Sequence, residues 1–165
     1  MNIFLSILWL FISILLQVLL FNQLHLFGGV VLIYLLCLLK LPVEIKQPIQ
    51  ILIGFVAGLL IDIFSNTLGI HALTCTFIMW LRVPIFHLFV LAEDFKSGSP
   101  NMKKMGVPEF IRFSVTLTVI HVSFLYLVES FSLFNIIPLV SKFLITSILT
   151  SLFIIACEFA KTKKE

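Results

Sequence analysis

One acidic residue, Asp62, stands inside the apolar stretch formed by residues 54–73. An ionisable side chain in apolar surroundings is costly, so it marks a candidate functional site. Gly54 and Gly58 form a GxxxG pair, and Asp62 follows four residues later on the same face of a helix. This face predicts close approach of another backbone, with Asp62 as a polar anchor for a partner's transmembrane helix. The alternative is that Asp62 only fixes the turn that follows.

The charge of Asp62 needs stabilising partners. Asp62 lies near the end of its predicted helix, where the carboxylate meets the negative end of the helix dipole. The candidate partners follow directly in the chain: the hydroxyls and backbone amides of Ser65, Asn66 and Thr67, and His71 beyond the turn.

Other polar residues in apolar runs are few. His121 and Glu129 are eight residues apart, and Lys142 lies in the last apolar run. Lys142 pairs with Glu129 or Asp62, or extends its amine to the membrane surface, which is the favoured interpretation. The chain has no HExxH, CxxC, GxSxG or Walker motif, and its cysteines are isolated. We therefore expect no catalytic residues, no metal site and no cofactor.

The composition indicates a membrane protein. Of the 165 residues 61% are hydrophobic and 12% are charged, and the mean hydropathy is +1.20. Soluble domains carry roughly twice that share of charge, about 25%. Apolar runs long enough to cross a bilayer favour helices over barrel strands. The prediction is an all-α, polytopic membrane protein forming one domain over residues 1–165, with six spans at about 3–21, 24–41, 48–64, 69–91, 108–128 and 136–159.

Two prolines and the charge pattern support this layout. Pro48 and Pro108 stand where a first helical turn accepts proline, whereas Pro84 predicts either a kink in the fourth span or a surface-lying segment over residues 85–95. The kink is favoured. Six spans place nearly all basic residues on one side, so the positive-inside rule predicts two cytoplasmic termini. The expected cytoplasmic basic surface consists of Lys96, Lys103, Lys104 and Arg112. The net charge of +3 fits contact with anionic lipid of the bilayer and gives no reason to invoke nucleic acid.

The stretch around Asp62 also resembles a known family signature. The series Gly58-Leu59, Asp62, Gly69 and His71-Ala72-Leu73 is similar to that of the MreD family of rod shape-determining membrane proteins. Length, six-span layout and basic tail agree along the whole chain, while only this stretch is specific. One departure is Asn66-Thr67, where many relatives carry glycine or proline.

The resemblance implies a non-enzymatic component of the cell-elongation machinery in the bacterial inner (plasma) membrane. Members act with MreC, the MreB filament, RodA and a penicillin-binding transpeptidase in lateral peptidoglycan synthesis. It also implies a bundle similar to the S components of energy-coupling-factor transporters.

Two functions follow as expectations. The first is a scaffold that maintains cell shape and binds MreC through Gly54, Gly58, Asp62, Gly69 and His71, while the basic connector faces the membrane-bound filament. The alternative is a small-molecule-binding transporter subunit that resembles an S component. A transporter subunit needs an enclosed pocket with converging polar groups. The sequence offers few such groups: Asp62, His71, His121, Glu129 and Lys142.

Overall fold

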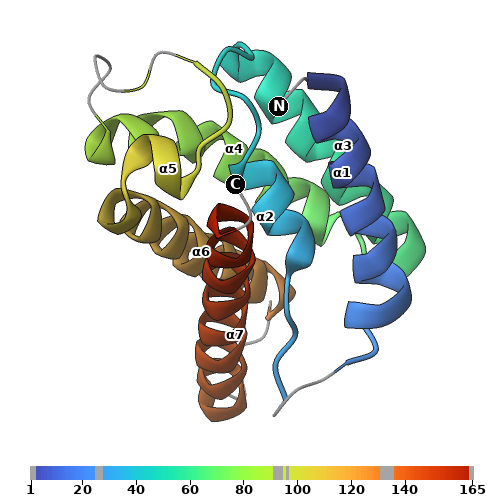
Figure 1. Cartoon of the computed structure of the whole chain (residues 1–165). Helices are drawn as coiled ribbons and strands as arrows, with labels where there is room; N and C mark the ends of the chain where they lie inside the picture. Colours follow the sequence, from blue (N-terminus) through green and yellow to red (C-terminus); the bar gives the residue numbers. More distant parts are fainter. Residues whose placement is uncertain (1–2, 25–27, 91–94, 96, 131–135, 164–165) are drawn as a thin grey trace.

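The computed structural model describes residues 3–24, 28–90, 95, 97–130 and 136–163, and within these ranges it contains helices and irregular segments but no strand (Figure 1). The helices are α1 (Ile3–Leu16) with a π-helical continuation η1 (Gln17–Phe21), α2 (Ile33–Leu39), α3 (Gln47–Ser65), α4 (Ile70–Phe89), α5 (Met102–Met105), α6 (Val107–Glu129) and α7 (Ile136–Thr162). The predicted all-α class is confirmed for this part of the chain.

Five helices are long and apolar enough to cross a membrane, and they are Phe4–Phe21, Gln47–Ser65, Ile70–Phe89, Val107–Glu129 and Leu139–Thr162. Only 28% to 39% of the most apolar window of each is buried inside the bundle. Large apolar side chains such as Phe4, Leu52 and Leu152 therefore cover its outside. Apolar surface on this scale is rare in soluble monomers and matches a lipid environment. The fold is consistent with a multi-pass helical membrane protein.

The prediction of six spanning helices is wrong, because residues 28–41 contain only the seven-residue helix α2. An irregular segment precedes α2, and side chains of other elements accept its backbone N–H groups: Thr146 from Val30, Thr150 from Leu32 and Gln17 from Ile33. Irregular backbone is tolerated at membrane depth where protein groups satisfy it in this way. Residues 25–27 of the predicted second span lie outside the described ranges.

This irregular segment and α2 lie alongside α7. The contacts to Thr146 and Thr150 continue in the same order to the ion pair of Lys40 with Glu158, so residues 30–40 run parallel to α7. At one end of the bundle, Ser6 of α1 and Lys161 of α7 line the same cavity. We call this end of the bundle the basic end. The opposite end carries the turn between α3 and α4, and we call it the elbow end. Figure 1 shows α2 between α1 and α7.

The predicted helix starts are confirmed: Pro48 and Pro108 occupy the first turn of α3 and of α6. There the missing N–H costs nothing and the fixed φ suits the helix. Helix α4 continues through Pro84 to Phe89, as the favoured interpretation expected. Residue 91, the last of the predicted span, and residues 92–94 of the segment over 85–95 lie beyond what the structure describes.

The core lies where α2 is surrounded by the longer helices. Tyr34, Leu35 and Leu38 of α2 have no exposed surface. Phe110 and Phe113 of α6 are equally buried. Helix α2 therefore lies at the centre of the bundle, where its side chains can contact several of the spanning helices.

Candidate functional site

The glycine face of α3 packs against α4 of the same chain. A Cβ atom on Gly54 would lie 2.6 Å from Cγ of Met79 and 2.8 Å from the carbonyl oxygen of Cys75. A Cβ on Gly58 would lie 2.6 Å from Cα of Ala72. The close backbone approach predicted from the GxxxG spacing is therefore present, but the neighbouring helix is intramolecular. In this arrangement α4 already occupies the face assigned to a partner's helix.

Asp62 joins the end of α3 to the beginning of α4. Asp62 is 3% exposed, and its carboxylate accepts hydrogen bonds from the backbone N–H of His71 at 3.0 Å and of Ala72 at 2.8 Å. The hydroxyl of Thr67 donates to it as well. The first amides of α4 form the positive end of that helix dipole, which offsets the unfavourable end of α3. Thr67 therefore donates to Asp62 as expected, whereas the backbone amides that donate to this carboxylate belong to residues 71 and 72.

The turn between α3 and α4 contains two residues in the left-handed backbone conformation. Asn66 has φ 54° and Gly69 has φ 81°. Asparagine tolerates this conformation better than other residues with a Cβ, because its short amide can bond locally. The turn at Asn66 is therefore available without a glycine or proline at this position. We call Gly58, Asp62, Thr67, Gly69 and His71 the elbow.

The ring of His71 continues the elbow into the core. Its Nδ1 lies 3.3 Å from the hydroxyl of Tyr34, which also lies 2.9 Å from Nε2 of His121. Tyr34 and His121 are completely buried. The elbow is thereby tied to α2 and α6 as well as to α3 and α4. Sequence reasoning missed Tyr34, although it is one of only two tyrosines in the chain.

A second buried polar cluster lies toward the basic end. Arg82 is 2% exposed, and its guanidinium donates to the carbonyls of Leu39 and Leu41 and, at 2.5 Å, to Oε1 of Gln50. Arginine suits this position because its planar fork can satisfy several acceptors. The sequence context of Arg82 alone does not reveal these contacts, because the two accepting carbonyls lie about 40 residues away in the chain. Its bonds fix the end of α2 between α3 and α4.

The predicted basic surface is partly described. Lys103 and Lys104 of α5 and Arg112 of α6 are exposed, while Lys96 lies outside the described residues. Nζ of Lys104 donates to the carbonyl of Ser97 at 2.8 Å. These side chains belong to neighbouring elements at the basic end.

A cavity of about 440 Å³ opens at the elbow end. It is lined by residues of η1 and the turn after it, the segment before α2, the end of α3, the elbow, α6 and α7: Val18, Asn22, Gln23, Gly28, Val30, Leu32, Phe64, Ser65, Thr67, His71, Leu125, Tyr126, Glu129, Lys142 and Thr146. Three of the five polar groups expected for a small-molecule site, His71, Glu129 and Lys142, line it. Asp62 and His121 do not. Lys142 is exposed, and among the described residues the one ion pair joins Lys40 to Glu158.

The described ranges contain no group of three or more His, Cys, Asp or Glu side chains that could hold a metal ion. Taken together, the fold and site define a helical bundle, consistent with a multi-pass membrane protein, whose buried polar groups join its spans. The chain matches no protein-family model, no curated protein and no solved structure.

Proposed function

We propose that this protein is a non-enzymatic scaffold of the cell-elongation machinery that binds MreC in the bacterial plasma membrane. One observation carries the proposal: the residues on which the MreD resemblance depends form a single interlocked unit. Gly58 admits α4, Asp62 caps the first amides of α4, and Gly69 supplies the positive φ of the turn. A chance match of spaced residues in an apolar chain would not require them to depend on one another.

The buried polar side chains also support a non-catalytic role. Those of the elbow and around Arg82 are engaged in hydrogen bonds that hold helices together. Both described chain ends lie at the basic end, and exposed Lys103, Lys104 and Arg112 gather there too. This arrangement supports two cytoplasmic termini under the positive-inside rule. The same end would face the MreB filament, with RodA and its transpeptidase as further partners.

Because α4 covers the glycine face, we assign MreC to another surface. An apolar groove of about 260 Å³ lies between α1 and α3 and is lined by nine apolar residues, Ile7, Leu10, Phe11, Ile14, Leu52, Ile53, Val56, Ala57 and Leu60. A groove between two spans offers a transmembrane helix the shape complementarity on which association in lipid depends. The groove is therefore the proposed seat of the transmembrane helix of MreC.

A groove-filling substitution tests this assignment. Val56→Trp is expected to reduce the recovery of MreC with the purified protein by about tenfold, because an indole in the groove removes roughly 1.4 kcal/mol or more of helix packing. Cells relying on this variant should become round. The measurement is co-purification from membranes, with imaging of cell shape.

The matched control is Leu152→Trp on α7, which is 59% exposed and does not border the groove. It should leave MreC recovery and rod shape unchanged. Equal MreC recovery with Val56→Trp would show that the groove is the wrong surface. Rods that persist on depletion of the protein, with no MreC recovered by the unaltered chain, would contradict the scaffold itself.

The cavity at the elbow end favours a second candidate function, a small-molecule-binding transporter subunit. Converging polar groups in a cavity of this size are typical of ligand sites. If this function holds, native mass spectrometry should detect a stoichiometric small molecule on the purified protein. Lys142→Met should abolish its retention, whereas Lys46→Met at the basic end should not. A purified chain without such an adduct would contradict the transporter function.

A further inference from the structure

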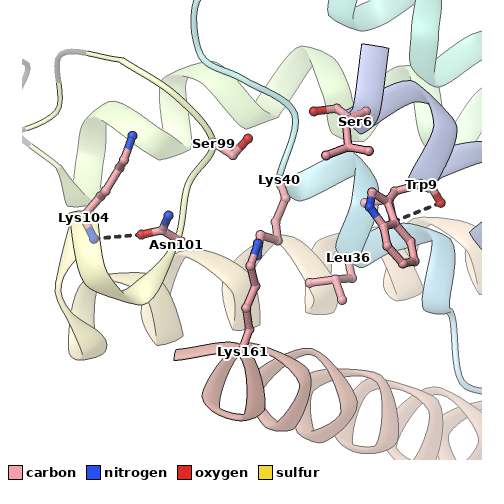
Figure 2. A pocket seen from close by; sticks show the side chains of 10 residues that line it. Ser6, Trp9, Leu36, Lys40, Ser99, Asn101, Lys104 and Lys161 are labelled. Atoms are coloured by element: carbon pink, nitrogen blue, oxygen red, sulfur yellow. Dashed lines mark hydrogen bonds between the residues drawn. The ribbon is translucent and has the colours of Figure 1, made fainter. Parts of the chain in front are cut away.

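A second cavity, of about 650 Å³, lies at the basic end (Figure 2). It is lined by the beginning of α1, the end of α2, the segment before and within α5, and the end of α7: Leu5, Ser6, Trp9, Leu36, Cys37, Lys40, Ser99, Asn101, Lys104 and Lys161. None of these residues belongs to the elbow or to the groove between α1 and α3. The cavity thus requires a separate explanation.

The charge of the lining is positive. Of the described residues that line the cavity, three are lysines and none is acidic. Nζ of Lys40 is compensated by Glu158 at 2.5 Å, and no described acidic residue pairs with Lys104 or Lys161. Nζ of Lys104 donates to the carbonyl of Ser97, which does not neutralise its charge. Figure 2 shows Lys40 and Lys161 extending toward one another in the cavity. Two uncompensated ammonium groups around one hollow favour an anionic ligand.

Neutral polar groups add to this preference. Ser99 lines the cavity and is 6% exposed, and its hydroxyl has no hydrogen-bond partner among the residues that the structure describes. A buried hydroxyl without a partner is costly, so a ligand oxygen at this wall would remove a penalty. Asn101 also lines the cavity, and its Oδ1 accepts the backbone N–H of Lys104 at 2.8 Å (Figure 2).

The remaining wall is apolar and continues onto the outside of the bundle. Leu5, Trp9 and Leu36 line the cavity, and Trp9 is 53% exposed on α1 near Phe4 and Leu8. Tryptophan is enriched where headgroups meet acyl chains. A ligand here would have a charged part beside the lysines and an apolar part along α1. A free phosphate ion would leave the apolar wall without a partner.

We propose that this cavity binds the phosphate headgroup of an anionic phospholipid, with Lys104 and Lys161 contacting the phosphate and Trp9 packing against an acyl chain. The site is independent of the proposed scaffold function. Bound lipid fills the hollow between α1, α2 and α7 and supplies an acceptor at Ser99.

Tryptophan quenching tests this site directly. Trp9 and Trp80 are the two tryptophans of the chain, so Trp80→Phe leaves Trp9 as the only emitter. Trp80 is 54% exposed and lies against Phe77, and a phenylalanine keeps that contact. The protein is placed in vesicles of mixed lipid in which either phosphatidylglycerol or phosphatidylcholine carries brominated chains. We expect brominated phosphatidylglycerol to quench Trp9 at about tenfold lower mole fraction.

A charge-removing variant and a matched control separate this site from general surface charge. Lys104→Gln with Lys161→Gln should make the two lipids equivalent, and Lys161→Gln alone should lose part of the preference. Lys46→Gln with Lys163→Gln removes the same charge from exposed positions outside the cavity and should keep the full preference.

Three results would overturn the proposal. The first is equal quenching by both lipids with Lys104 and Lys161 intact. The second is an equal loss of preference in the control variant, which would indicate surface charge alone. The third is full reversal of the preference by millimolar inorganic phosphate, which would identify a free phosphate site. Lipid preference that resists phosphate and depends on Lys104 and Lys161 would establish the site.

Discussion

Gly58→Leu is expected to prevent the hairpin of α3 and α4 from forming, even in the isolated protein. A Cβ on Gly58 would lie 2.6 Å from Cα of Ala72 and would also overlap the carbonyl of His71. Both atoms belong to backbone, so no side-chain rotation can relieve the overlap. Overpacking of an adaptable core costs about 1–3 kcal/mol, and here the helices must separate and break the bonds to Asp62 as well. We therefore expect a loss above about 3 kcal/mol.

The measurement is the yield of monodisperse protein in detergent and its thermal unfolding midpoint. Gly58→Ala, which adds only the Cβ, should lower both values to a smaller degree. Ile63→Trp adds more volume to the same helix but at a position that is 65% exposed, so it should leave both unchanged. A wild-type midpoint for Gly58→Leu would show that the close approach at Gly58 does not stabilise the hairpin.

Much of the fold was predictable because hydropathy reports directly on spanning segments. The predicted spans over 48–64, 69–91, 108–128 and 136–159 agree within a few residues with α3, α4, α6 and α7. Proline supplied two of the starts, because it is accepted in a first helical turn and excluded from most other helical positions.

The second span could not be predicted correctly from the same signal. Hydropathy measures side chains, and residues 28–41 are as apolar as a helix that faces lipid. Their backbone departs from a helix because Thr146, Thr150 and Gln17 accept its N–H groups. Two of these acceptors lie more than 110 residues away in the chain. Only the packed structure brings them together.

The candidate site was predicted only in part, because residue spacing within one helix does not identify contacts with distant segments of the chain. The spacing of Gly54, Gly58 and Asp62 shows that they share a helical face, but spacing does not identify the helix that covers this face. The local partner Thr67 was predictable because it follows in the same turn. Tyr34 was not, because its contact with His71 joins α2 to α4.

Asp62→Ala is expected to lower the free energy of unfolding by about 3 kcal/mol, because it leaves hydrogen-bond donors without an acceptor at the buried N-terminus of α4. The N–H groups of His71 and Ala72 and the hydroxyl of Thr67 all donate to this carboxylate. Asp62→Asn keeps one acceptor but replaces the other with a donor, so about half of that loss is expected.

Reversible unfolding in mixed micelles measures both losses, and Glu129→Ala serves as the control because this carboxylate is exposed at the end of α6. Its removal should change the free energy of unfolding by less than about 0.5 kcal/mol. An Asp62→Ala protein as stable as this control would show that the three hydrogen bonds do not hold the elbow. If Asp62→Ala instead destabilises the isolated chain as expected, a loss of the proposed MreC binding in this variant would follow from unfolding of the elbow. Val56→Trp then remains the substitution that reports on the proposed partner surface.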